Sequence, residues 1–226
     1  VNNFNPGSIG TAQTICEGDV PAALTTLVAP SGDSTFDLLW QESTDGVNFT
    51  DIAGETNDNY TPPALTADTW YRIEVTSVLG GSTCVEYTNA VKVTVNNFDP
   101  GSIGSDQTIC ESTAPAALTS VSPTGDGTFT YKWYSSPDDI TYTEIVGAIG
   151  ETYNPGMLTA DTYYKREVTS TLNGKACTEE TNTVLITVNN FDPGSISGEQ
   201  TICEGDVPAA LGSVTPTDRK STRLNS

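Results

Sequence analysis

Five cysteines are the residues of this 226-residue chain whose spacing points most clearly to chemistry. Cys16 and Cys84 lie about as far apart as Cys110 and Cys177, and Cys203 follows in a third copy of the surrounding motif. A metal site would favour close pairs such as C-x-x-C, so this spacing favours one disulfide in each repeat. We therefore expect Cys16–Cys84 and Cys110–Cys177 bridges, with Cys203 unpaired by truncation of its domain. Such bridges indicate an extracellular location, because cytosolic thiols stay reduced.

The side-chain inventory excludes the commonest catalytic arrangements. The chain has no histidine, so Ser-His-Asp and Cys-His sites cannot form. Neither a P-loop nor a dinucleotide-binding glycine motif occurs. Asp138 and Asp139 are adjacent acids, but they fall in a predicted hairpin turn, and the first repeat has no such pair there. The sequence therefore predicts a protein that is not an enzyme.

Two acidic residues in matching loops are weak candidates for calcium ligands. Asp33 lies in SGDST and Asp126 in TGDGT. Calcium takes six or more oxygen ligands, and no EF-hand spacing is present. We expect these acids to be solvated loop residues and predict no cofactor, with calcium as the alternative.

Three positions match glycosylation patterns. Asn48 and Asn59 begin N-x-Thr acceptor sequences. Ser34 follows Asp33 in a sequence that resembles the Asp-Ser/Thr-x acceptor used for O-glycans by Bacteroidota. The Asn sites do not recur in the second repeat, so the sequence leaves modification open.

The charge of the chain limits its partners. It carries 29 acidic and 9 basic residues, for a formal net charge of -20. Nucleic acids and anionic membranes both require a basic surface, so we expect neither nucleic-acid binding nor membrane insertion of this fragment. The last nine residues, 218–226, match no repeat and resemble a translated sequencing adapter, so we interpret them as an artefact.

Internal repeats organise the chain. QTICEGDVPAAL at Gln13 returns as QTICESTAPAAL at Gln107 and again, unchanged, at Gln200. LTADTWYRIEVTS from Leu65 matches LTADTYYKREVTS from Leu158. We expect repeat 1 at residues 1–95, repeat 2 at 96–188 and the N-terminal part of repeat 3 at 189–217.

The pattern within each repeat is typical of strands. Segments such as YRIEVTS alternate apolar and polar residues, and turn-forming residues separate them at strand spacing. This predicts an all-β fold of tandem immunoglobulin-like antiparallel sandwiches. Trp40 and Trp133 are expected to be buried in the third strand. Tyr71 and Tyr164 resemble the corner tyrosines of fibronectin type III domains, whose hydroxyl groups bind the upstream backbone.

A recurring segment predicts the connection between repeats. VNNFDPGSI occurs at Val95 and at Val188, where Asp-Pro-Gly favours a turn. We expect short, stiff linkers. The predicted joint residues are Phe98, Pro100, Phe191 and Pro193, with the two phenylalanines wedged between consecutive sandwiches.

Together these motifs resemble a known family. The ICEGD-PAAL opening, the W-x-x-S-x-D strand and the closing NAVKVTVNN are similar to tandem Ig-like and PKD-like repeats of large Bacteroidota surface proteins. The resemblance implies a non-catalytic extracellular rod, stalk or fibre for adhesion or for matrix or filament assembly. Its partners would be neighbouring repeats or further copies, as in a homopolymeric filament.

The alternative is a glycan-binding module of a lectin-like adhesin or of a secreted polysaccharide-degrading enzyme. That function requires an exposed aromatic platform. Tyr131, Tyr134 and Tyr142 are the aromatic residues without an expected core position, and the first repeat has other residues at these places.

Overall fold

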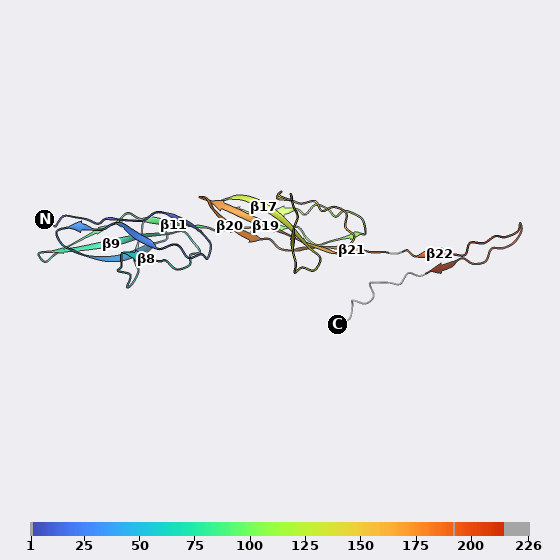
Figure 1. Cartoon of the computed structure of the whole chain (residues 1–226), viewed down its shortest axis with the longest axis horizontal. Coiled ribbons are helices and arrows are strands. Elements are labelled where there is room, and N and C mark those ends of the chain that lie inside the picture. Colours follow the sequence, from blue (N-terminus) through green and yellow to red (C-terminus); the bar gives the residue numbers. More distant parts are fainter. Residues whose placement is uncertain (1, 192, 215–226) are drawn as a thin grey trace.

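The computed structural model describes residues 2–191 and 193–214, and these residues form strands without a helix. None of them therefore belongs to a helix long and apolar enough to span a membrane. Figure 1 shows two sandwiches placed end to end, followed by an extended segment. The predicted all-β tandem sandwich architecture is confirmed. The adapter-like residues 218–226 lie outside the described part of the chain.

The first sandwich contains the strands up to Asn96. They are β1 (Phe4–Asn5), β2 (Ser8–Ile9), β3 (Gln13–Cys16), β4 (Leu24–Val28), β5 (Ser31–Gly32), β6 (Thr35–Ser43), β7 (Thr50–Asp51), β8 (Asn59–Tyr60), β9 (Thr69–Leu79), β10 (Ser82–Tyr87) and β11 (Val91–Asn96). One layer is a six-stranded sheet in the order β3-β11-β9-β6-β7, with β10 also paired to β9. The opposite layer contains β2, β4 and β8.

The second sandwich repeats this arrangement. Its strands are β12 (Phe98–Asp99), β13 (Ser102–Ile103), β14 (Gln107–Cys110), β15 (Ser120–Val121), β16 (Thr124–Gly125), β17 (Thr128–Ser136), β18 (Thr143–Glu144), β19 (Thr162–Leu172), β20 (Lys175–Glu180) and β21 (Val184–Asn189). Its six-stranded sheet has the equivalent order, β14-β21-β19-β17-β18, with β20 on β19. In the following segment, β22 (Ser195–Ser197) pairs with β23 (Gly212–Val214).

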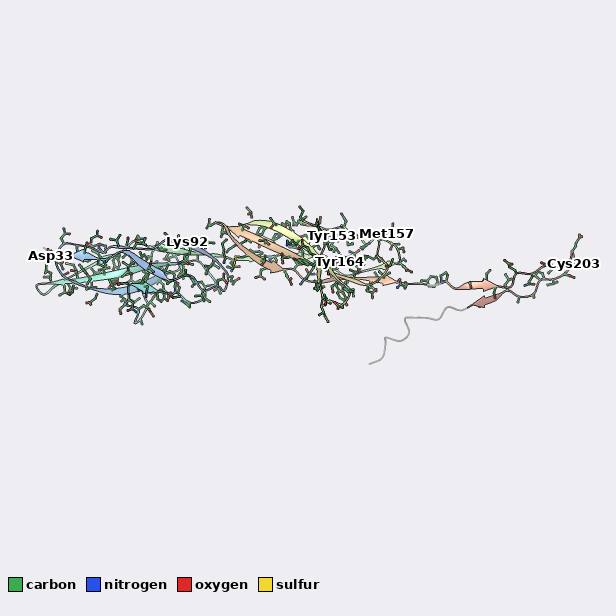
Figure 2. The ribbon with its side chains drawn as sticks, in the orientation of Figure 1. Asp33, Lys92, Tyr153, Met157, Tyr164 and Cys203 are labelled. Atoms are coloured by element: carbon green, nitrogen blue, oxygen red, sulfur yellow. A yellow bond between two sulfur atoms is a disulfide. The ribbon has the colours of Figure 1, made fainter. Side chains whose placement is uncertain are left out.

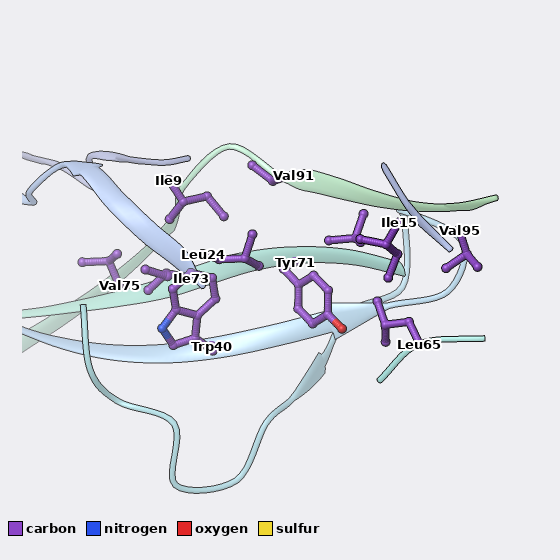
Figure 3. Packing of buried hydrophobic residues seen from close by; sticks show 11 residues of the cluster. Ile9, Ile15, Leu24, Trp40, Leu65, Tyr71, Ile73, Val75, Val91 and Val95 are labelled. Carbon is purple, nitrogen blue, oxygen red and sulfur yellow. The ribbon is translucent and has the colours of Figure 1, made fainter. Parts of the chain in front are cut away.

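The two layers enclose an aromatic and aliphatic core. Figure 3 shows Trp40 and Tyr71 surrounded by branched aliphatic side chains from both layers. Strand alternation produces this core, because every second residue of β9 from Thr69 to Ser77 is directed inward and is buried. Trp133 and Tyr164 occupy the equivalent positions in the second cluster.

One pairing differs from the expected antiparallel pattern. β3 runs parallel to β11, and its register places Cys16 beside Asn96. β14 pairs with β21 in the same way and places Cys110 beside Asn189. The early cysteine of each repeat therefore lies where the chain leaves its sandwich, which decides which cysteines can meet.

Candidate functional site

The disulfide of this chain joins the two sandwiches. Cys16 is bonded to Cys177, with the Cα atoms 5.6 Å apart and a sequence separation of 161 residues. Cys84 and Cys110 are free thiols, as is Cys203. The expected Cys16–Cys84 and Cys110–Cys177 bridges within repeats are therefore wrong.

Strand register explains why the expected bridges cannot form. Cys84 pairs with Ser77 near the tip of the β9–β10 hairpin, at the end where the chain enters its sandwich. Cys16 lies beside Asn96 at the exit. About eleven residues of strand separate these levels, or roughly 35 Å at about 3.3 Å per residue. A disulfide requires Cα atoms within about 7 Å. The same geometry directs the β19–β20 hairpin back toward the first sandwich, as Figure 1 shows.

A buried asparagine binds the same hairpin. The Asn96 amide donates hydrogen bonds to the carbonyl oxygens of Ser170, at 2.9 Å, and Lys175, at 3.3 Å. The Ser170 hydroxyl donates to the Asn96 side-chain oxygen at 2.8 Å. Both side chains are buried, so removing either one would leave unpaired polar atoms without water. Asn96 on β11 and Cys16 on the adjacent strand β3 thus both bind the β19–β20 hairpin.

Two exposed contacts lie beside the disulfide and the Asn96 hydrogen bonds. The Lys175 ammonium lies 3.4 Å from the Asp19 carboxylate, and both side chains are about half exposed. The Asn173 amide donates to the Thr14 hydroxyl at 3.2 Å. Exposed pairs of this kind contribute at most about 1 kcal/mol, so the disulfide and the Asn96 hydrogen bonds are the main constraints on the joint.

Phe98 takes a different position from the expected wedge. Its ring lies 5.8 Å, centroid to centroid, from the ring of Phe129 in the same sandwich. It also lines a cavity of about 190 Å³ at the joint, together with Cys16 and Asn96. Phe191 is 76% exposed. Phe98 therefore packs on a ring of its own repeat and also borders the joint.

A buried arginine that the sequence pattern did not predict lies beside the linker. Arg166 is fully buried, and its guanidinium donates to the carbonyl oxygens of Glu151, at 2.7 Å, and Pro100, at 2.8 Å, and to the Ser120 hydroxyl. Burial lowers the pKa of this arginine from its ordinary value. The predicted joint residue Pro100 is thereby tied to the second core, whereas Pro193 lies in the extended segment. The signal was a charged residue at an inward position, YKREV against YRIEV.

The predicted core aromatic residues are buried in both sandwiches. The indole of Trp40 donates to the carbonyl oxygen of Asn57, and that of Trp133 to Gly150, both at 2.8 Å. The Tyr71 hydroxyl is buried without a hydrogen bond of standard geometry, so the expected bond to the upstream backbone is absent. Burial raises the pKa of Tyr164 to about 12.

The candidate calcium ligands do not converge. Asp33 and Asp126 are exposed in the equivalent loops of separate sandwiches, and Figure 2 shows Asp33 at the far end of the first one. The residues that the structure describes contain no group of three or more His, Cys, Asp or Glu side chains placed to hold a metal ion.

The acidic residues that were candidates for catalysis lie in turns. The Asp138 carboxylate accepts backbone hydrogen bonds from Ile140 and Thr141, which lower its pKa. Asp45 does the same for Val47 and Asn48 in the first repeat. These carboxylates close hairpin turns in both repeats.

The glycosylation candidates lie on the first sandwich. Asn48 and Asn59 are exposed, whereas Ser34 is half buried against the Ser77 hydroxyl. Asn48 also donates its side-chain amide to the Asp45 carboxylate at 2.7 Å. Asn48 and Asn59 are therefore the two exposed acceptors, and the amide of Asn48 is held by Asp45.

The leftover tyrosines do not form one platform. Tyr131 and Tyr134 are three residues apart on β17, so they face opposite sides of the sheet. Tyr131 lies against the Arg166 guanidinium, 5.1 Å from ring centroid to carbon. The Tyr142 hydroxyl donates to Asp139, and Lys165 lies over its ring.

Comparisons with solved structures return tandem immunoglobulin domains at low identity. Sidekick-1 domains 1–4 are 16% identical over 82% of this chain and 47% of that one, with a TM-score of 0.39. Titin domains A168–A170 are 14% identical over 82% of this chain and 68% of that one, with a TM-score of 0.41. This chain spans about half the length of the Sidekick-1 structure.

Sequence comparison gives the family. No curated protein sequence matches the chain. One family model matches it twice, over residues 5–97 and 99–190, so that each match covers one sandwich. The chain therefore belongs to the family described as Domain of unknown function (DUF8696).

Proposed function

We propose that this chain is a non-catalytic structural repeat of an extracellular surface protein. Its sandwiches would form a rod, stalk or fibre that serves adhesion or the assembly of a matrix or filament. The observation that carries this proposal is the Cys16–Cys177 bridge between the sandwiches. A covalent bond across a joint resists bending and separation, which a projecting rod needs and an isolated domain does not.

The remaining contacts support the same function. The Asn96 hydrogen bonds lie beside the disulfide on the neighbouring strand, so the hairpin is held at two points and its rotation is limited. A net charge of -20 opposes side-by-side packing and leaves end-to-end contacts favoured. A disulfide also requires an oxidising location, which supports the extracellular assignment. The resemblance to Bacteroidota surface repeats points in the same direction.

Small-angle scattering of the full chain tests the rod. Cys177→Ser should broaden the distribution of interdomain distances, because it removes the covalent constraint at the joint. Asn96→Ala should broaden it less, since the disulfide stays. Cys203→Ser is the matched control, because Cys203 is a free thiol outside the joint, as Figure 2 shows.

Thermal unfolding of the same variants shows whether the disulfide constrains the joint or stabilises a single sandwich. A disulfide that closes a long loop within one domain stabilises it by roughly 4 kcal/mol on the chain-entropy model. Neither cysteine of the bridge belongs to the hydrophobic clusters around Trp40 and Trp133, so Cys177→Ser should leave the unfolding midpoint of each sandwich nearly unchanged. A Cys177→Ser variant that loses sandwich stability but keeps its narrow distance distribution would rule out the proposal.

A further inference from the structure

An arginine on the outer face of the first sandwich is held between two aromatic rings. Arg72 has an outward position on β9, and its Cζ atom lies 4.0 Å from the centroid of the Phe49 ring and 3.8 Å from that of Tyr87. Phe49 belongs to the β6–β7 hairpin, whereas Tyr87 lies on β10, which pairs with the other edge of β9. The two rings therefore approach from opposite sides, and each contacts one face of the guanidinium group.

Hydrogen bonds fix the direction of this guanidinium group. Arg72 Nε donates to the side-chain oxygen of the buried Gln41 at 2.8 Å. The Gln41 amide donates in turn to Asp51 at 2.8 Å and to Glu74 at 3.1 Å, so these carboxylates are bound to Gln41. Among the residues that the structure describes, neither Nη group of Arg72 has a hydrogen-bond or ion-pair partner. The two Nη groups form an edge of parallel donors, a geometry that fits a carboxylate at both oxygens.

The other cations of residues 2–191 and 193–214 have partners within the protein. Each lysine in these ranges lies 2.6 to 3.4 Å from a carboxylate oxygen, and the four are Lys92, Lys132, Lys165 and Lys175. Arg166 donates to oxygen atoms of its own sandwich. The chain carries 29 acidic and 9 basic residues, so carboxylates are abundant. Arg72 is therefore exceptional in this part of the chain, because it is accessible to solvent and lacks a carboxylate partner.

The second sandwich has a cation at the same position. Lys165 lies opposite Tyr134 in the β17–β19 register, as Arg72 lies opposite Gln41 in the β6–β9 register. The ring of Tyr142, from the β17–β18 hairpin, lies 4.3 Å from the Lys165 ammonium group. Both repeats thus place a cation beside an aromatic ring on the outer face of the same strand.

The partner of the cation differs between the repeats. Glu180 on β20 has the register position that Tyr87 has on β10. In the second repeat, the Glu180 carboxylate binds the Lys165 ammonium at 2.7 Å. In the first repeat, Tyr87 supplies an aromatic ring and no charge. The carboxylate that the second repeat provides from its own chain must therefore come from another molecule in the first.

From this difference we infer that Arg72, Phe49 and Tyr87 form a binding site for an acidic polysaccharide. The Arg72 guanidinium binds the carboxylate of one hexuronic acid unit through its two Nη groups. The Tyr87 ring, which is 43% exposed, contacts the C–H groups of the sugar ring beside this carboxylate. A hexuronic acid carries both groups in one unit, whereas an acidic side chain of a peptide matches the guanidinium alone.

The test is calorimetric titration of the full chain with oligogalacturonate at about 0.15 M salt, where a Debye length of about 8 Å screens the more distant acidic residues. The wild type should bind this probe. The methyl ester of the same oligosaccharide should bind at least about tenfold more weakly, because it has no charged acceptor. Arg72→Gln should lower the affinity for oligogalacturonate by a similar factor. Arg72→Lys should also lower it, since lysine keeps the charge without the two parallel donors.

Tyr87→Glu is the most selective variant, because it keeps Arg72 and introduces the carboxylate that the second repeat has at this position. The affinity should fall at least about tenfold, since the ligand must compete with an acceptor in the protein. Lys165→Gln removes the equivalent cation of the second sandwich and is the matched control, with unchanged affinity. Thermal unfolding followed by tryptophan fluorescence shows that each variant is folded. If Arg72→Gln fails to fold, Tyr87→Glu decides the result.

A wild type that does not bind oligogalacturonate, or that binds the methyl ester equally well, would overturn the inference. Unchanged affinity in Tyr87→Glu would do so as well. Tighter binding of polyglutamate than of oligogalacturonate would assign the site to acidic peptides and exclude the polysaccharide. The inference goes beyond the proposed rod and concerns the first sandwich alone. Small-angle scattering of the same protein therefore tests the rod independently of ligand binding.

Discussion

The two sandwiches share strand order and register but differ at one inward position of the longest strand. The first has Ile73 there, packed in the cluster around Trp40. The second has Arg166, also fully buried. The comparison shows that this core position accepts an aliphatic or a charged side chain without a change in strand order.

The second core accepts the arginine because the neighbouring positions supply oxygen atoms. Its guanidinium donates to two backbone carbonyl oxygens and a hydroxyl, and Tyr131 lies against it where the first repeat has Leu38. One of these carbonyl groups belongs to Pro100 in the segment that follows the joint. The difference therefore links the second core to the linker, a connection that Ile73 cannot make.

Placing an arginine in the first core is the strongest test of this comparison. Ile73→Arg should destabilise the first sandwich by about 3–5 kcal/mol, because the charge is buried without the matching acceptors. Thermal unfolding followed by tryptophan fluorescence measures the change. An equally stable variant would show that the first core already contains the acceptors.

The reciprocal change should have a smaller effect. Arg166→Ile should destabilise the second sandwich by about 2–3 kcal/mol, because it leaves the partly buried carbonyl groups of Glu151 and Pro100 without these donors. Hydrogen exchange should also accelerate in residues 98–103, which the arginine anchors. Unchanged hydrogen exchange in these residues would show that Arg166 does not stabilise the linker. Arg72→Ile, at an outward position of β9, is the control.

A glycine shared by both repeats should respond equally in the two sandwiches. Gly7 and Gly101 have positive φ angles of 78° and 69°, and a Cβ atom at either one would lie 2.1 Å from a carbonyl oxygen. Gly7→Ala and Gly101→Ala should each cost about 1–3 kcal/mol. Unequal losses in the free energy of unfolding, measured with denaturant, would show that the two turns contribute differently to stability.

Alkaline pH should weaken both cores through their buried tyrosines. Burial raises the pKa of Tyr164 from 10.0 to about 12, and it raises that of Tyr71 as well. A raised folded-state pKa gives stability that is complete below pH 10 and is lost as the pH rises toward 12. Unfolding midpoints should therefore fall over this range.

Phenylalanine substitutions assign this pH effect. Tyr71→Phe and Tyr164→Phe should each flatten the fall in their own sandwich. Tyr71→Phe should cost little at neutral pH, because the Tyr71 hydroxyl has no hydrogen bond of standard geometry to lose. A steep fall that persists in the double variant would assign the effect to other groups.

The smallest effect is expected at the rim of the joint. Asp19→Asn removes the ion pair with Lys175, whose partners are about half exposed, so stability should change by less than about 1 kcal/mol. The equivalent positions in the other repeat are uncharged, since Thr113 stands in repeat 2 where repeat 1 has Asp19, and Ser82 stands in repeat 1 where repeat 2 has Lys175. A measurable change in interdomain distances for Asp19→Asn at low salt would show that the ion pair constrains the joint more than expected.

Local pattern was a sufficient guide to the sandwich architecture. Alternation along YRIEVTS predicts an inward face, and the structure buries every second residue of this segment. The joint could not be read in this way. Phe98 suggested a wedge because it is apolar in a polar linker, yet its partner is Phe129, which lies about thirty residues further on.

The sequence by itself determined that each repeat folds as a β-sandwich, because strand periodicity and turn chemistry act over a few neighbouring residues. It also placed one early and one late cysteine in each of the two full repeats. Only the tertiary structure decided how they pair. The parallel β3–β11 register carries the early cysteine to the exit of its sandwich, and the hairpin carries the late one to the entrance. Disulfide partners are chosen by distance in space, so Cys16 bonds to the next repeat.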